Sequence, residues 1–421
     1  MRVFCGLAKL ALMTIRFQEI TYSTQGASLS RRQWLNKAAQ LGGASAALGL
    51  SETAWAQLLG TPPAAPANPT PAATSAATSA KTSTPTAPAA SAPTASSSPF
   101  APALKVEKRV IQIAVANKTA LTYLPLTIAE QLGYFAAEGL ELELQEAPSL
   151  VRAQQSVAAG TADMVCGWVE NTLALQANGP QFAAFVLMGR APQIALGVST
   201  KTMPAAKGLA DLAGKKVGIV APSTPTHTVA YAALSRAGLR SADMGFVSVG
   251  TPSGALAALR SGQIDAICYT DPLITQLEQR GELRVMADTR TMRGTVQACG
   301  GDMPASCLYA TPEFMQKHPN TTQAAAYAIV HALKWLQTAG VSDLMRTVPE
   351  SYFAGDRALY LAAFASMRDA IALDGTIPAD GVRNTLSAMR SAEPLLRAQA
   401  IDPARCFTNT FANKAKQRYK V

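Results

Sequence analysis

Ser223, Thr224, Thr226 and His227 form the segment of this 421-residue sequence best suited to binding a small solute. They open a predicted helix in which Thr224 is the N-cap and Pro225 is the first helical residue. Backbone N–H groups and the helix dipole at such a terminus favour an anion, to which His227 can also donate. The same residue types serve ordinary helix capping, and a histidine here can equally pack or face solvent. The segment therefore predicts a solute contact, and the alternative is that these residues only cap and pack the helix.

Two more loops place polar or aromatic side chains directly after predicted strands. Gly167 and Trp168 follow one short apolar strand, where a tryptophan can stack on a solute or wall it off. Glu170, two residues later, favours the start of the next helix through the helix dipole. Tyr269 ends another apolar strand, and Asp271 lies in the loop that follows it. Asp271 precedes a proline, so it is interpreted either as a helix cap or as a solute contact.

The remaining candidates lie near the first two predicted strands. The polar residues that follow these strands are Asn117, Thr122, Tyr123 and Ser149. Ser149 stands where the second strand gives way to a helix, which is another N-terminal corner suited to an anion. Arg152 and Arg190 are the basic side chains best placed to meet an anion, although a solvated arginine is the commoner role.

The elements that must position these side chains alternate between strands and helices. The predicted strands are 109–115, 140–146, 163–166, 182–187, 216–220, 246–249, 265–269 and 283–287. The predicted helices between them are 124–134, 150–159, 169–177, 225–237, 253–261 and 272–280. Such alternation is typical of α/β folds whose parallel sheets carry helices on both faces. After about residue 312 the pattern becomes helical, as in 322–339 and 357–371.

One pattern occurs twice in the chain. Gly-x-x-Asp-x-x-Cys stands at residues 160–166 and again at 262–268, each time after a predicted helix and with the cysteine closing an apolar strand. The glycine can end the helix in the left-handed conformation, and the aspartate can hold the turn into the strand. The repeat predicts two similar lobes. Because open α/β sheets bind ligands outside the carboxyl ends of their strands, we expect a solute site in the cleft between the lobes.

The first 103 residues differ in composition from the rest. A twin arginine at 31–32, a modestly apolar segment and a small-x-small site ending at Ala56 resemble a twin-arginine export signal, with Trp34 in place of the usual phenylalanine. We expect cleavage after Ala56 and export to the periplasm, with Met1 or Met13 as the start. In residues 61–103, 40 of 43 positions are Ala, Pro, Thr or Ser, which predicts that 57–103 is a disordered linker.

Composition and motifs exclude several classes of protein. No apolar run reaches the roughly 18 residues that a membrane-spanning helix needs. Part of the net charge of +10 lies in residues 1–56, which hold six basic and two acidic side chains. The remaining excess of basic side chains is scattered along the chain, so nucleic acid is not an expected partner. There is no metal-type Cys/His spacing, nucleophile elbow or phosphate loop. The sequence predicts neither a metal nor a cofactor.

Loss of the export signal would leave five cysteines, because Cys5 leaves with it. The lack of small and apolar residues before Cys5 argues against a lipid-modified cysteine. An odd number excludes a complete set of intramolecular disulfides, although Cys299 and Cys307 can be imagined to close a short loop in an oxidising compartment.

A set of short segments resembles a known family. They are LTYLPL at 121–126, LGYFAAEGL at 132–140, Ala159-Gly160 with Asp163, LADLAGKKV at 209–217, Gly262 with Asp265, and Asp271-Pro272. In this order and spacing they resemble the periplasmic solute-binding proteins of nitrate/sulfonate/taurine/bicarbonate-type ABC importers. That family shares its fold with thiamine-pyrimidine precursor synthases. The resemblance covers about residues 109–290, and the helical C-terminal part is similar only in character.

The resemblance implies a periplasmic-binding-protein type II fold, in which the chain crosses twice between two lobes. The crossings are expected near 197–201 and 299–310. The expected parts are the export signal 1–56, the linker 57–103, lobe 1 at 104–198 plus 308–421, and lobe 2 at 199–300. In the family, the loops matching 117–123 and 223–227 contact the ligand.

The implied function is capture of a small solute, expected to be an anion such as a sulfonate or nitrate, by a monomer that delivers it to an ABC permease in the inner membrane. A ligand-sensing receptor of a non-ABC system and a pyrimidine-precursor synthase are the alternatives. The synthases carry a clustered-cysteine motif that this sequence lacks, and their chemistry belongs inside the cell. We therefore expect a binding protein without a cofactor and not an enzyme.

Overall fold

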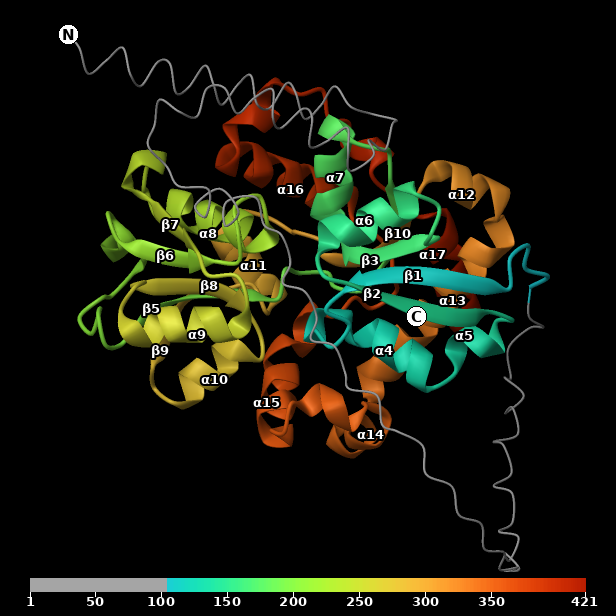
Figure 1. Ribbon diagram of the computed structural model, residues 1–421, viewed down its shortest axis with the longest axis horizontal. Helices are drawn as coiled ribbons and strands as arrows, with labels where there is room; N and C mark the ends of the chain where they lie inside the picture. The colour runs from blue at the N-terminus through green and yellow to red at the C-terminus, as the bar shows by residue number, and fades with distance from the viewer. Residues whose placement is uncertain (1–103) are drawn as a thin grey trace, which may run out of the picture. The chain divides into compact units, whose positions relative to one another are not determined.

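The computed structural model describes residues 104–421, which build two five-stranded sheets (Figure 1). The predicted export signal, its cleavage after Ala56 and the linker at 57–103 lie outside the described residues. Within residues 104–421, no helix is long and apolar enough to cross a membrane. The predicted α/β fold is confirmed, and the predicted strands and helices are found in the predicted order.

The first sheet has the order β2-β1-β3-β10-β4. Its strands are β1 (Val110–Ala116), β2 (Glu141–Ala147), β3 (Met164–Trp168), β4 (Ala183–Leu187) and β10 (Ser306–Ala310). Strand β1 is parallel to both β2 and β3, whereas β10 runs antiparallel between β3 and β4.

The second sheet repeats this plan in the order β7-β6-β8-β5-β9. Its strands are β5 (Ile194–Ser199), β6 (Lys216–Ile219), β7 (Gly245–Ser248), β8 (Ala266–Thr270) and β9 (Leu283–Asp288). Strand β6 is parallel to β7 and β8, and β5 runs antiparallel between β8 and β9. Each sheet thus contains one antiparallel strand that the chain contributes from beyond a crossover.

The two crossovers lie between β4 and β5 and between β9 and β10. The first comes earlier than the sequence predicted, because residues 194–199 pair as β5 in the second sheet and do not form the expected crossing near 197–201. A side chain on Gly197 would meet Leu283, so this glycine allows two strands to pack closely and does not mark a turn.

Helices cover both sheets. The helices packed around the first sheet before the crossover are α4 (Leu124–Gln131), α5 (Tyr134–Ala137), α6 (Leu150–Ala158) and α7 (Val169–Asn178). The helices of the second sheet are α8 (Pro225–Arg236), α9 (Pro252–Ser261), α10 (Leu273–Gln279) and α11 (Met292–Cys299). The C-terminal helices are α12 (Pro312–Lys317), α13 (Pro319–Thr338), α14 (Val341–Thr347), α15 (Arg357–Met367), α16 (Ala379–Ala392) and α17 (Thr410–Tyr419).

We call lobe 1 the first sheet with α4–α7 and α12–α17, and lobe 2 the second sheet with α8–α11. Helices α13 and α17 of the C-terminal part pack on each other, and α13 also packs on α4, so this part belongs largely to lobe 1. Helices α15 and α16 also reach lobe 2, because α15 packs against α10 and α16 packs against α8. Figure 1 shows α16 (red) above the boundary between the two sheets and α15 (orange) below it.

The repeated Gly-x-x-Asp-x-x-Cys pattern has the same structural role in both lobes. Each glycine is left-handed, with φ of +74° in the first copy and +79° in the second. The Asp163 carboxylate accepts the backbone N–H of Gln112 in β1 at 2.9 Å, and the Asp265 carboxylate accepts that of Lys216 in β6 at 3.0 Å. Each aspartate therefore fixes the start of a strand against its parallel neighbour, which confirms the predicted likeness of the lobes.

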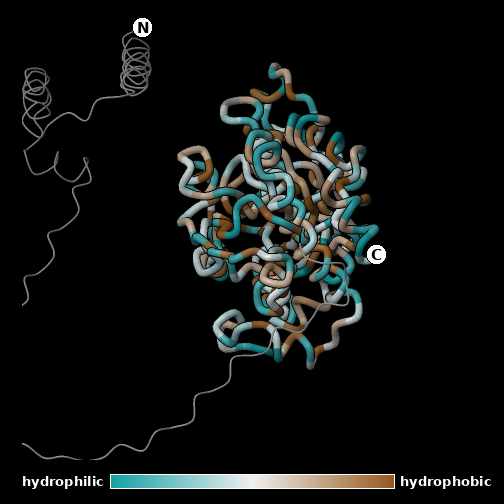
Figure 2. Tube along the Cα trace, turned by 90° about the vertical axis from the view of Figure 1, so that its right-hand side faces the viewer, coloured by the Kyte–Doolittle hydropathy of each residue, from teal (hydrophilic) through white to brown (hydrophobic). Residues whose placement is uncertain are grey.

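The buried apolar residues of lobe 1 form one cluster and those of lobe 2 form two, one of which also contains Ala388 of α16. Figure 2 shows hydrophobic and hydrophilic segments interleaved along the chain. The five described cysteines are free and buried, and burial raises the pKa of each thiol. The disulfide considered for Cys299 and Cys307 is absent. The two residues belong to different cores, Cys299 to that of lobe 2 and Cys307 to that of lobe 1.

Candidate functional site

The predicted site residues lie at or just after the carboxyl ends of five strands. These strands are β1, β2 and β3 in lobe 1 and β6 and β8 in lobe 2, and most of the residues belong to β1, β3, β6 and β8. Within each sheet the two strands are parallel neighbours, so their loops emerge at one edge. The contacts described below show that the loops after β3 and β6 meet each other across the lobe boundary.

Trp168 joins the two lobes by packing. It is the last residue of β3 in lobe 1, yet its side chain packs against the core of lobe 2. Burial in the core of lobe 1 raises the pKa of Tyr123, and the neighbouring Trp168 side chain opposes this rise. Its backbone N–H is held by Asn171 at 3.0 Å, which fixes the start of α7.

Glu170 makes the most buried polar contact between the lobes. It stands in the first turn of α7, with 6% of its surface exposed, and accepts a hydrogen bond of 2.8 Å from the Thr228 hydroxyl of α8. Burial raises the pKa of Glu170 to about 7, the negative charge of Glu393 adds to the rise, and the Thr228 hydrogen bond opposes it. Glu170 is therefore a carboxyl group that titrates near neutrality at the lobe contact.

Ser223 and His227 of lobe 2 meet a second carboxylate. The Ser223 hydroxyl donates to Glu393 Oε1 at 2.9 Å, and Nδ1 of His227 lies 3.2 Å from the same oxygen. Glu393 is the residue that ends α16. Burial lowers the pKa of His227, although Glu393 opposes this, and the backbone N–H of Ser223 donates to Nδ1 at 3.3 Å. Nδ1 thus faces both the Ser223 N–H and the Glu393 carboxylate, and burial holds the pKa of His227 below its ordinary value of 6.5.

The two threonines of the predicted corner point into their own loop. Thr224 donates its hydroxyl to the carbonyl of Ala221 at 2.7 Å, and the Thr226 hydroxyl accepts the N–H of Val220 at 3.0 Å. These two hydroxyls hold the loop between β6 and α8 in shape. The Ser223 hydroxyl, in contrast, reaches Glu393 at the end of α16.

Three non-glycine residues in the segments after β1, β4 and β6 have a left-handed backbone. They are Asn117 after β1, Gln193 in the first crossover and Ser223 after β6, with φ of 61°, 59° and 57°. This conformation is costly for residues with a side chain, and it persists where surrounding structure holds it, often at functional sites. Asn117 and Ser223 follow the corresponding strands β1 and β6, so the same backbone feature occurs at the same strand end in both lobes.

Other predicted site residues have partners that account for them without a solute. The Tyr269 hydroxyl donates to the Gly250 carbonyl at 2.7 Å. Asp271 accepts hydrogen bonds from the backbone and hydroxyl of Thr275, and Arg290 lies 3.4 Å from it. These contacts stabilise lobe 2 internally.

In lobe 1, Ser149 caps α6 by accepting the N–H of Arg152 at 3.3 Å, and Thr122 is buried beside Tyr123 in a short 3₁₀ turn. A side chain at Gly167 would come within 2.8 Å of the Tyr309 ring, so this glycine is required by packing. Whether any of these residues also touches a solute remains a prediction.

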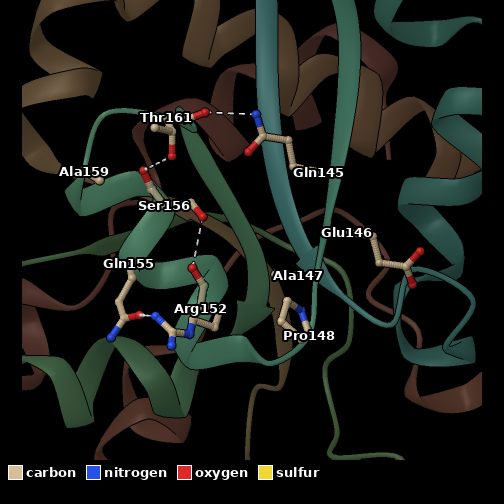
Figure 3. A pocket seen from close by; sticks show the side chains of 9 residues that line it. All are labelled: Gln145, Glu146, Ala147, Pro148, Arg152, Gln155, Ser156, Ala159 and Thr161. Carbon is tan, nitrogen blue, oxygen red and sulfur yellow. Dashed lines mark hydrogen bonds between the residues drawn. The ribbon is translucent and has the colours of Figure 1, made fainter. Parts of the chain in front are cut away.

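The hollow in Figure 3 lies on the surface of lobe 1, between β2 and α6, and has a volume of about 360 Å³. Its lining polar groups bond to one another. Arg152 donates to Gln155 at 3.0 Å, Gln145 donates to the Thr161 carbonyl, and the Thr161 hydroxyl donates to the Ser156 carbonyl. Arg152 is the one residue considered for anion binding that lines this hollow, and it is bonded locally.

The sequence analysis missed Glu393 and Thr228 and interpreted Glu170 as a helix-start residue. Glu393 lies 170 residues after Ser223, in the helical region where the sequence matches the resembled family only in character. No local signal near Glu393 points to the lobe boundary. Within residues 104–421, no group of His, Cys, Asp and Glu could hold a metal ion.

Two lobes of this topology, joined by two crossovers and meeting at strand-end loops, define the periplasmic-binding-protein class of fold. A family described as NMT1/THI5 like matches residues 121–339, and the chain belongs to this family. A search of curated proteins found no match.

Solved structures agree with the class. A protein from Bordetella bronchiseptica is 45% identical with a TM-score of 0.68, over 76% of this chain and 100% of that chain. The periplasmic aliphatic sulphonate-binding protein SsuA from Escherichia coli is 20% identical with a TM-score of 0.54, over 72% and 94%. The desulfurization enzyme DSZB is 15% identical with a TM-score of 0.52, over 74% and 100%. The last two likenesses establish the fold.

Proposed function

We propose that this protein is an extracytoplasmic solute-binding protein that captures a small molecule between its lobes and delivers it to an ABC permease. The observation that carries the proposal is the lobe contact itself. Trp168 and Glu170 after β3 meet the residues after β6 across a boundary that the chain crosses twice. Binding at strand-end loops with hinge closure is the general behaviour of such two-lobed folds. The sulphonate-binding neighbour supports the same role by analogy.

The solute contacts that we propose first are Asn117, Trp168, Ser223 and His227. Asn117 and Ser223 hold the matching left-handed positions, and Trp168 and His227 reach the lobe boundary. The sequence predicts an anionic solute, so sulfonates and nitrate belong among the compounds to be tested.

A same-fold enzyme is the second candidate, because the fold also occurs in a desulfurization enzyme. Thiol chemistry is disfavoured in the described part of the chain, since its five cysteines are buried and burial raises the pKa of their thiols. A turnover assay with the solute, once one is found, separates the two candidates.

Thermal unfolding of the purified protein against a panel of solutes tests the proposal. The panel should contain nitrate, taurine, alkyl sulfonates, carboxylates, amines and neutral amides. A solute at a thousand times its Kd should add about 4 kcal/mol to the stability, and so raise Tm by several degrees. A shift with one chemical class, lost in Trp168→Ala, supports a binding protein. A panel without any shift would contradict capture of these solutes.

Partner and location need separate experiments. Copurification from membranes with a permease, as opposed to a sensor kinase, distinguishes an importer from a receptor. We propose that the twin arginine directs export, so replacement of both Arg31 and Arg32 by lysine should retain the protein inside the cell. Deleting 61–103 should leave solute affinity unchanged.

A further inference from the structure

A second hollow lies along α16, in the part of the chain that the sequence describes only as helical. It has a volume of about 490 Å³ and is formed by α16, the 3₁₀ turn at Pro394–Ala398 and the segment that follows this turn as far as Pro403. Three arginines, two serines and three apolar residues line it, and no acidic residue does. None of the residues proposed as solute contacts is among them. We call it the α16 hollow.

The arginines of the α16 hollow are spaced to act together. Arg383 and Arg390 stand seven residues apart on α16 with Ser387 between them, so all three lie on one face of the helix. Two helical turns separate the two arginines by about 10 Å along the helix axis. Arg397 joins them from the 3₁₀ turn. Three long cationic side chains therefore border one hollow.

Most of this positive charge is not balanced by carboxylates. Among the ion pairs of the part of the chain that the structure describes, the one that involves the hollow joins Arg383 to Asp380 on the exposed surface. Arg390 and Arg397 bond instead to neutral backbone carbonyls, Arg390 to that of Gln399 at 3.0 Å and Arg397 to that of Arg390 at 2.8 Å. These bonds hold both guanidinium groups and leave their charge unpaired.

The other acidic side chains of this region are bonded elsewhere. Residues 379–405 hold four arginines but three acidic residues. Besides Asp380, these are Glu393, whose carboxylate accepts a hydroxyl from lobe 2, and Asp402, whose carboxylate caps the next 3₁₀ turn. Glu170 of α7, a helix that packs against α16, bonds to α8. The α16 hollow is therefore a concentration of positive charge without an acidic lining.

Hydrogen-bonding capacity is also unused beside the hollow. Nε of Arg390 and Oε1 of Gln399 are buried without a partner, and Ser387 is exposed. An unpaired buried donor of a charged group is unfavourable, so an oxygen toward which the Arg390 guanidinium turns would gain this bond as well as the charge. The donors around the hollow therefore favour an anion with several oxygens.

Charge and shape narrow the class of anion. One guanidinium group occupies both oxygens of a carboxylate, whereas the oxygens of a phosphoryl group can be shared among several arginines. A phosphate monoester also carries close to two negative charges at neutral pH. The apolar residues Leu386, Ile401 and Pro403 line the rest of the hollow and suit a short carbon frame attached to the phosphoryl group.

We infer that the α16 hollow binds a phosphoryl anion between Arg383, Arg390 and Arg397, either as a free phosphate ester or as the headgroup of a lipid. This site is separate from the proposed capture of a solute between the lobes. Either one can therefore fail experimentally without the other.

Calorimetric titration of the full chain at pH 7.5 and constant ionic strength tests the class of anion. The probes are glycerol 3-phosphate and pyrophosphate, compared with succinate and propanesulfonate. At least one phosphoryl probe should bind at least tenfold more tightly than both comparison anions, because it brings more charge and more oxygens to one point. Equal or tighter binding of succinate or propanesulfonate would overturn the phosphoryl assignment.

Two variants test the site. Ser387→Glu places a carboxylate on the face that carries the arginines without removing any of their bonds, and glutamate is well accepted at an exposed helical position. The double variant Arg390→Gln/Arg397→Gln removes two of the positive charges. Each variant should weaken binding of the phosphoryl probe at least tenfold. Binding that survives in both would overturn the α16 hollow as the site.

Arg346→Gln is the matched control. Arg346 is exposed on α14, pairs with Asp343 and does not line the hollow. The control should bind the phosphoryl probe as the unmodified protein does, and a loss as large as in the test variants would show that overall charge attracts the probe, which would overturn the inference. Trp168→Ala should likewise retain phosphoryl binding, and its loss there would move the site to the lobe contact. Circular dichroism and urea unfolding check that every variant is folded.

Cosedimentation with vesicles distinguishes the two sources of the phosphoryl group. The vesicles are phosphatidylcholine alone and phosphatidylcholine mixed with phosphatidylglycerol. Binding to the mixed vesicles that Ser387→Glu abolishes, without binding of the soluble probes, supports a lipid headgroup. Binding of glycerol 3-phosphate without binding to vesicles supports a free ester. Failure of the soluble probes and the vesicles alike would overturn the inference and leave the proposed solute capture untouched.

Discussion

Replacing Glu170 by glutamine should change how the stability of the protein depends on pH. The carboxyl of Glu170 is raised from an ordinary pKa of 4.5 to about 7 in the folded protein, first of all by burial. Between these two values the folded protein binds more protons at this group than the unfolded chain does. The free energy of unfolding therefore falls as the pH rises from about 4.5 to about 7, and this part of the stability is fully present only below that window.

The size of the effect follows from the shift. Each pKa unit corresponds to about 1.4 kcal/mol, so the rise from 4.5 to about 7 amounts to roughly 3 kcal/mol. Glutamine keeps the shape and can still accept the Thr228 hydroxyl, but it never ionises. The Glu170→Gln variant should thus match the unmodified protein near pH 4.5 and exceed its free energy of unfolding by about 3 kcal/mol at pH 8.

Urea unfolding of both proteins across pH 4.5 to 8, analysed by linear extrapolation, measures this difference. Subtracting the two curves removes most of the contributions of other titrating groups, such as His331, whose pKa is lowered to about 4. Glu350→Gln, which removes one negative charge from the exposed surface of lobe 1, is the control and should show no such difference. A Glu170→Gln curve parallel to that of the unmodified protein would refute the assignment of Glu170 as a buried group that ionises near neutrality.

Three further predictions concern packing and chain geometry. Gly167→Ala should lower stability by about 1–3 kcal/mol, because the new methyl would lie 2.8 Å from the Tyr309 ring; an unchanged Tm would contradict the packing role. Asp265→Ala should cost about 0.5–1.5 kcal/mol by removing the carboxylate that accepts the N–H of Lys216, and urea unfolding should detect it; equal stability would show that water replaces the bond. The cysteines of the described region, Cys299 among them, should resist alkylation in the folded protein and react after unfolding, and mass spectrometry of the labelled peptides would expose any that react early.

The fold was largely predictable because its local signals agree. Parallel strands that alternate with helices produce apolar runs and caps that stand out in one sequence, and the repeated aspartates mark the same strand start in each lobe. Two strands, β5 and β10, were missed. Both are short and antiparallel, and both join a sheet formed mainly by a distant part of the chain. They can therefore be recognised from the strands they pair with but not from the residue pattern of their own segments.

The contacts at the lobe boundary were predictable only in part. The ends of β3 and β6 can be located from the sequence, and Trp168, Ser223 and His227, which the sequence proposes as solute contacts, do lie there. The acidic partner of Ser223 comes from the end of α16, and nothing in its neighbourhood distinguishes Glu393 from any other surface glutamate. The anionic solute stays a prediction, to which the structure adds that Ser223 of the helix-terminus corner bonds to Glu393.

The exchange of one strand between the sheets has a consequence for the order in which the chain can fold during synthesis. All five strands of the second sheet lie in one continuous stretch, 194–288, whereas the first sheet needs Ser306–Ala310 to lie between β3 and β4. A nascent chain that ends at residue 300 holds every strand of lobe 2 but leaves a gap in the sheet of lobe 1. The lobe that begins later on the ribosome is therefore the first whose sheet can be completed.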